Sequence, residues 1–244
     1  MFTLIFEFFT VFILAILPQI LSSFYPDEMR DVLSKLPGNW RFFSTLPSRI
    51  GVILLVLYIS ASRRDDFHSI GLNFQQAASP LALFATGFLT GYLLLIFVVS
   101  RLRSKKVKDQ IVNVRQRTMA GLVYSPTAGV WQKLLYFIDL WLAVIGEELV
   151  YRGYLILLLG SQTGNLYAWM AFSATLSVVV HLYQGRTWRV AISHMLLACL
   201  FIFVAVITNS LFAAIIPHLV YNTVWLIRAL RNKPNEEATP QEIN

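Results

Sequence analysis

Long apolar runs separated by short polar stretches dominate this chain. A helix that crosses a membrane needs about 20 mostly apolar residues, and the runs predict spans at 2–22, 49–61, 80–100, 134–160, 165–183, 190–207 and 211–230. The second run is short, and the run at 134–160 is long enough to break into two helices. The pattern therefore predicts an all-α, polytopic transmembrane bundle of about seven spans, within a range of about six to eight.

The composition supports a membrane protein. Hydrophobic residues make up 57% of the chain and charged residues 14%, whereas soluble domains carry about a quarter charged residues. The formal net charge of +7 could suggest a nucleic-acid partner, but the basic residues lie in short stretches between apolar runs. That distribution is typical of membrane proteins. We therefore expect contact with membrane lipids and no nucleic acid.

Charge also predicts the orientation and the division of the chain. The densest basic stretch, between the third and fourth predicted spans, contains Arg101, Arg103, Lys105, Lys106, Lys108, Arg115 and Arg117. Basic loops stay on the cytoplasmic side, so this stretch fixes the topology. We divide the chain into N-terminal helices with the basic loop (1–130), a catalytic helical core (131–231) and a polar tail (232–244) that we expect to be disordered. The first span contains Glu7 and has no basic residue before it, so we expect it to be retained.

Ionisable side chains inside the predicted spans are the candidates for function, because each costs roughly 2.5–3.5 kcal/mol near the bilayer centre. Three of them share one helix. Glu148 and Arg152 are four residues apart, on one face, and are expected to pair. Glu147 is turned about 100° from Glu148 and has no partner on its own helix, which suits a general base. The remaining acidic or histidine residues are given interfacial or structural roles: Asp139, Glu7 and His194.

Two further helices carry polar groups suited to amide chemistry. His218 and Asn222 also lie four residues apart; an imidazole transfers protons, and a carboxamide can donate to a developing oxyanion. His181 stands at the end of its predicted span. If the span that holds Glu147 begins near Trp141, all three helices place these groups in the inner half of the bilayer. We therefore predict one active site within the membrane.

These motifs resemble the CPBP family, the CAAX-protease and bacteriocin-processing intramembrane proteases also called Abi. The family pattern is Glu-Glu-x-x-x-Arg, Phe-x-x-x-His and His-x-x-x-Asn on three successive helices. The matching positions are Glu147, Glu148 and Arg152, then His181, then His218 and Asn222. Ser177 stands where the family usually has Phe, which removes packing bulk but no proton-transfer group. The resemblance covers residues 135–230.

The resemblance implies an endopeptidase that cleaves a membrane-associated peptide or protein, either prenylated or leader-bearing. It implies that Glu147 and His181 activate water and that His218 and Asn222 stabilise the oxyanion. Glu148, paired as described above, would hold the first helix in place. We expect an integral membrane protein of a bacterial plasma membrane with its site facing the cytoplasm; no oligomeric state is predicted.

The cofactor and two other functions stay open at this point. Two histidines and a carboxylate could hold Zn²⁺, and its ligands would then be Glu147, His181 and His218; a metal-independent glutamate mechanism is the other option. The alternative function is a catalytically silent member of the family, acting as an immunity or regulatory protein. A small proton or metal transporter is a third reading, weakened by the lack of interrupted helices in matching halves.

Overall fold

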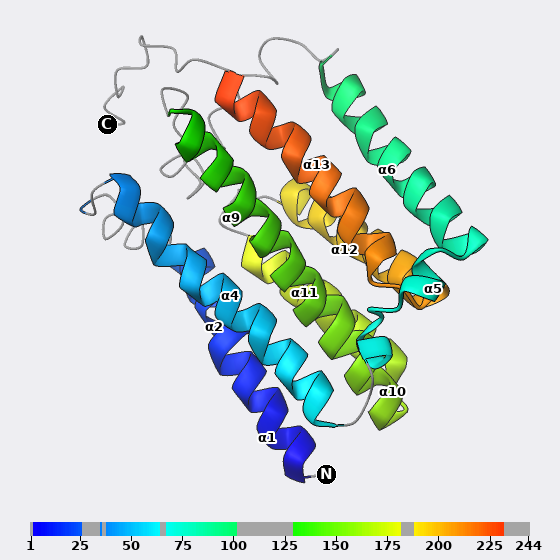
Figure 1. Cartoon of the computed structure of the whole chain (residues 1–244). Coiled ribbons are helices and arrows are strands. Elements are labelled where there is room, and N and C mark those ends of the chain that lie inside the picture. The colour runs from blue at the N-terminus through cyan, green and yellow to red at the C-terminus, as the bar shows by residue number, and fades with distance from the viewer. Residues whose placement is uncertain are drawn as a thin grey trace.

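The computed structural model describes residues 2–25, 35, 38–63, 67–101, 129–181 and 188–231, and within these ranges the chain is helical with short turns and no strand (Figure 1). Every predicted span falls on a helix, so the all-α bundle is confirmed. The basic segment beyond Arg101 and the tail at 232–244, which we predicted to be cytoplasmic and disordered respectively, lie outside the described residues.

The N-terminal part contributes three long helical rods. The first is continuous through α1 (Phe2–Val11), η1 (Phe12–Ile16) and α2 (Leu17–Phe24). Helix α4 (Gly38–Ser62) begins well before the predicted span 49–61. The predicted span was too short because Pro47 and basic residues interrupt the apolar pattern in the first half of this helix. After the short turns η2 (Phe67–Ile70) and α5 (Phe74–Ala77), α6 (Pro80–Arg101) is the third rod.

The C-terminal part holds the motif residues. The long predicted span does not break: α9 (Val130–Glu148) continues into the π-helical segment η3 (Leu149–Leu158) and then α10 (Leu159–Thr163). The chain then forms α11 (Leu166–His181), α12 (Trp188–Thr208) and α13 (Phe212–Arg231). The change to π winding starts directly after Glu148, and π segments occur frequently at functional sites.

Within the described ranges, four helices are long and apolar enough to cross a membrane by length and composition: Thr3–Leu21, Thr45–Ser62, Pro80–Val99 and Ala191–Thr208. Leu166–His181 and Phe212–Ile227 are shorter apolar helices. The outer face of α6 carries exposed Phe84 and Phe88, while Leu89 and Leu93 pack inward against α12 and α13. Such a lipid-facing apolar surface is characteristic of a membrane protein.

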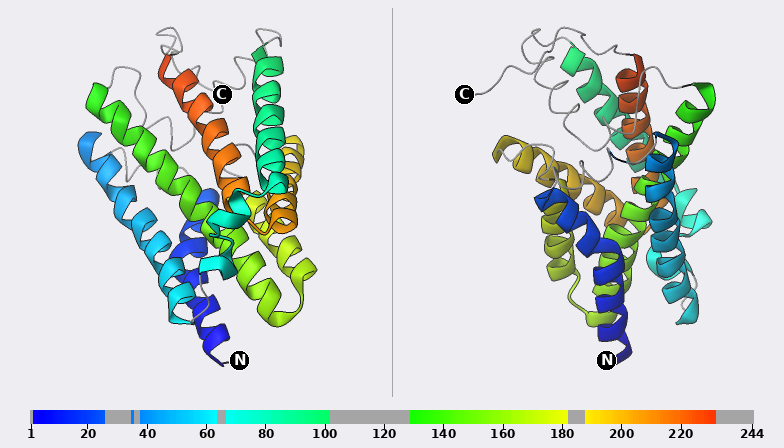
Figure 2. Two further views of the ribbon diagram at one scale, coloured as in Figure 1. Left: turned by 45° about the vertical axis from the view of Figure 1, so that its right-hand side comes forward. Right: turned by 90° about the vertical axis from the view of Figure 1, so that its left-hand side faces the viewer.

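Segment η3 forms the centre of the bundle. All its residues except Leu157 are buried, and its side chains share one core with residues of the first rod, α4, η2, α11 and the start of α13. Gly153 permits close approach here, since a Cβ atom at that position would lie 3.2 Å from the carbonyl oxygen of Ile70. In Figure 1, α9 lies between α4 and α13, with α6 beyond α13, and Figure 2 shows α12 inclined to α4. The motif segments thus meet in the interior.

Ion pairs join α4 to α9 near one end and to α1 near the other. Asp139 is 2% exposed and accepts from Arg49 Nε at 3.1 Å and from Thr45 Oγ1 at 3.1 Å. Its carboxylate is thus a buried partner of α4 within the bundle, and its predicted place at the membrane interface stays a prediction. At the other end of α4, Arg63 pairs with Glu7, which confirms a structural contact for that carboxylate.

Candidate active site

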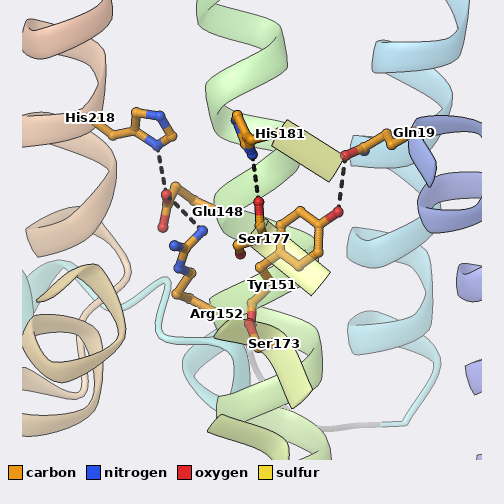
Figure 3. A network of polar contacts seen from close by, with 8 residues as sticks. All are labelled: Gln19, Glu148, Tyr151, Arg152, Ser173, Ser177, His181 and His218. Carbon is orange, nitrogen blue, oxygen red and sulfur yellow. Dashed lines mark hydrogen bonds and ion pairs between the residues drawn. The ribbon is translucent and has the colours of Figure 1, made fainter. Parts of the chain in front are cut away.

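Glu148 is the junction between the first and third motifs. Its side chain has no exposed surface; one carboxylate oxygen, Oε1, lies 3.2 Å from Arg152 and 2.7 Å from His218 Nδ1 (Figure 3). The predicted pairing within the first helix is present. The contact with His218 was not predicted, and it brings α13 against α9 at the motif level. An anionic carboxylate between a guanidinium and an imidazole forms strong, charge-assisted hydrogen bonds.

An aromatic side chain of α12 covers this junction. Phe201 is 2% exposed, and its ring stacks on that of His218 with centroids 4.9 Å apart and planes 29° apart. The guanidinium carbon of Arg152 lies 5.6 Å from the centroid of the same ring. Phe201 thus contacts both partners of Glu148. Nothing in its sequence context distinguishes it from the other apolar residues of its span, so sequence reasoning missed it.

His181 has a different set of contacts. Its Nδ1 lies 2.7 Å from the carbonyl oxygen of Ser177, one turn earlier in α11. Its ring stacks on that of His194, with centroids 4.8 Å apart and planes 24° apart. Ser177 is 6% exposed, and its hydroxyl has no hydrogen-bond partner among the described residues. His194 was predicted to be structural, and the fold places its ring directly against that of a motif histidine.

Both motif histidines are anchored through the same ring atom. A carbonyl oxygen and an ionised carboxylate only accept hydrogen bonds, so Nδ1 of His181 and Nδ1 of His218 each carry a proton. The second ring nitrogen, Nε2, is then the atom through which each imidazole can act on a substrate or on water. In its neutral form this nitrogen is an acceptor, and in the imidazolium it is a donor.

Tyr151 ties the first motif to the N-terminal rod. Its hydroxyl donates to Gln19 Oε1 at 3.0 Å, and its carbonyl oxygen accepts from Ser173 Oγ at 2.8 Å. Tyr151 is 1% exposed and lies four residues after Glu147, whose charge acts on it electrostatically. Gln19 stands among apolar residues and carries no motif, so it was missed.

Glu147 and Asn222 are half-buried, and among the residues that the structure describes neither side chain forms a hydrogen bond or ion pair. His218 contacts Glu148, the neighbour of Glu147, whereas the contact drawn for His181 is with Ser177 of its own helix (Figure 3). The fold therefore joins Glu148, Arg152 and His218 directly. Among the described residues, no hydrogen bond or ion pair links Glu147 or Asn222 to either histidine.

Within the described ranges, no three His, Cys, Asp or Glu side chains are grouped closely enough to hold a metal ion. Spare polar capacity is present instead: Glu148 Oε2 and Arg152 Nε are buried and have no partner among the described residues. Such buried groups are costly unless satisfied, so water or substrate could donate a hydrogen bond to Glu148 Oε2 and accept one from Arg152 Nε.

Fold and site together define a polytopic helical membrane protein with a buried acid–base network. Residues 129–224 match the family model described as Type II CAAX prenyl endopeptidase Rce1-like. The match supports the resemblance to the CAAX proteases over this region and shows that this part of the chain is similar to Rce1-like endopeptidases. No curated protein and no solved structure matches the chain.

Proposed function

We propose that this chain is an intramembrane endopeptidase that hydrolyses a peptide bond near the end of a membrane-associated substrate, prenylated or leader-bearing. The observation that carries the proposal is the contact between Glu148 and His218. It links the first and third motifs of the Rce1-like domain through a carboxylate with no exposed surface. Ionic groups of this kind are expensive inside a bilayer and mark functional sites.

The mechanism starts with water. Glu147 makes no hydrogen bond or ion pair among the described residues, and His181 has a lone pair on Nε2. Together they accept a proton from a water molecule while the water oxygen attacks the scissile carbonyl carbon. The C–N bond then breaks, and the same proton passes to the leaving amine. The products are a new carboxylate and a new amine, so the chemistry balances with water as the only co-substrate.

His218 and Asn222 stabilise the developing oxyanion. Because Nδ1 of His218 donates to Glu148, its Nε2 offers a proton only when the ring is an imidazolium. The carboxylate of Glu148, which also lies 3.2 Å from Arg152, holds this ring through Nδ1. The Asn222 amide supplies the second donor. Preorganised donors of this kind contribute about 10²–10³ each to the rate.

We place the protein in a bacterial plasma membrane with the site open to the cytoplasm. The support is the basic segment between the third and fourth spans, which favours the cytoplasmic side. In that orientation the site would meet substrates that are attached to the inner leaflet by a lipid.

The test uses the full-length protein in lipid nanodiscs and a fluorescence-quenched peptide that ends in a prenylated CAAX sequence. We expect Glu147→Gln and His181→Ala each to lower kcat by at least about 10²-fold. Glu147→Gln should also unfold like the wild type, since it removes no described contact. His68→Ala is the matched control, because His68 is exposed in η2.

Cleavage by Glu147→Gln at the wild-type rate would refute the assignment. A silent immunity or regulatory protein predicts a different result: no cleavage by the wild type, and a cellular phenotype that survives the same substitution.

A further inference from the structure

Helix α12 carries none of the three motifs, yet it contacts both motif histidines. His194 stacks on His181, and Phe201 stacks on His218. The two stacks have similar geometry, with centroids 4.8 and 4.9 Å apart and interplanar angles of 24° and 29°. One helix therefore covers one face of each imidazole.

The spacing of these two residues explains how a single helix achieves this. His194 and Phe201 are seven residues apart, which is about two helical turns, so they lie on one face. Ala198 and Ala205 lie on the same face of α12 and are 4% and 0% exposed. This face of α12 therefore points to the bundle interior. A rise of about 10 Å between the two ring positions also agrees with the lack of a shared metal group among the described histidines and carboxylates.

Stacking adds a restraint to the hydrogen bond of this ring. The bond between His181 Nδ1 and the carbonyl oxygen of Ser177 holds one edge of the ring, and the ring of His194 lies against its face. A second ring against its face fixes its plane, and the direction of Nε2 is then determined.

We propose that α12 is the positioning helix of this site: His194 orients the imidazole of His181, and Phe201 orients that of His218, each through ring stacking. The inference rests on the proposed function for its catalytic consequence. Both residues act through the histidines and make no direct contact with substrate. Their contribution should therefore appear in kcat and leave KM unchanged.

The experiment compares variants that keep a ring with variants that remove it, in the full-length protein with the prenylated CAAX peptide. His194→Leu and Phe201→Leu should each lower kcat by about two- to tenfold, the worth of one aromatic pair. His194→Phe and Phe201→Tyr should retain most of the activity. In a His181→Ala background, His194→Leu should have no further effect on residual cleavage.

Equal losses in the Leu and Phe variants of His194 would overturn the proposal, because a ring without an imidazole would then fail to substitute. A further loss in the His181→Ala background would overturn it as well, since His194 would then act independently of His181. A rise in KM at unchanged kcat would assign these residues to substrate binding and contradict positioning.

A second measurement separates this inference from the proposed function. The chain contains four histidines, so ¹⁵N-histidine spectra can be assigned by single substitutions. We expect the wild type to show protonated Nδ1 in His181 and His218. His194→Leu should alter the signals of His181 and leave those of His218 unchanged, and Phe201→Leu should do the reverse. Unchanged His181 signals in His194→Leu would refute the positioning role even if the peptide is never cleaved.

Discussion

Removing the charge of Glu148 is the perturbation whose cost can be worked most directly from the structure. The Glu148 side chain is 0% exposed and that of Arg152 5% exposed. Glu148→Gln therefore leaves a guanidinium in the interior with aromatic faces of Phe201 and Tyr151 as its neighbours. Orphaning one partner of a buried pair costs about 3–5 kcal/mol, roughly two to four orders of magnitude in the unfolding equilibrium.

Replacing both partners distinguishes the ion pair from simple packing. In Glu148→Leu/Arg152→Met no charge is left buried, and the exchange for apolar groups of similar volume is close to neutral. One cost remains, because His218 Nδ1–H loses its acceptor, which is worth about 1–3 kcal/mol. We therefore expect the double variant to be more stable than Glu148→Gln, yet inactive, because the orientation of His218 is lost.

The assay is unfolding in detergent micelles by titration with sodium dodecyl sulfate, followed by tryptophan fluorescence, together with peptide cleavage on the same samples. Phe88→Leu, on the lipid-facing surface of α6, is the control for detergent effects. The reasoning fails if Glu148→Gln has the same free energy of unfolding as the wild type. It also fails if the double variant loses as much free energy of unfolding as Glu148→Leu and Arg152→Met lose separately when added together.

Two further predictions concern the contacts between the N-terminal helices and the domain. Arg49→Leu should lower the free energy of unfolding more than Asp139→Leu, because it strands a carboxylate that is 2% exposed, whereas the guanidinium left by the second change is 26% exposed and can reach water; equal losses in the same assay would contradict this. Gln19→Leu should cost about 1–3 kcal/mol by leaving the Tyr151 hydroxyl without its acceptor, and adding Tyr151→Phe should restore part of that loss. A double variant no more stable than Gln19→Leu would show that this hydrogen bond is not what the substitution removes.

The spans were predictable from the sequence because lipid requires continuous apolar helices. The start of α4 was not, since Pro47 and Arg49 interrupt the apolar run. Arg49 pairs with Asp139, which lies 90 residues away in the chain. A pairing between distant charges leaves no signal in either local pattern.

The pairing of Glu148 with Arg152 was predictable from their spacing, while the contacts between different helices were not. Consecutive positions such as Glu147 and Glu148 differ by about 100° around a helix, and tertiary packing alone decides which of them faces α13. The sequence favoured a structural pair for Glu148 and left its contact with His218 unseen. The π winding that begins at Leu149 changes the helical phase, which a pattern read at 3.6 residues per turn does not capture. Stacking by His194 and Phe201 likewise depends on how α12 is rotated.

In the proposed mechanism, this polar network uses water to hydrolyse a peptide bond inside the bundle. The most direct measurement is mass spectrometry of the prenylated CAAX peptide after incubation with the nanodisc-embedded protein in H₂¹⁸O. We expect the wild type to release a product whose new carboxylate carries ¹⁸O, and Glu147→Gln to release no labelled product. An intact peptide with the wild type, or the same labelled product from both proteins, would contradict it.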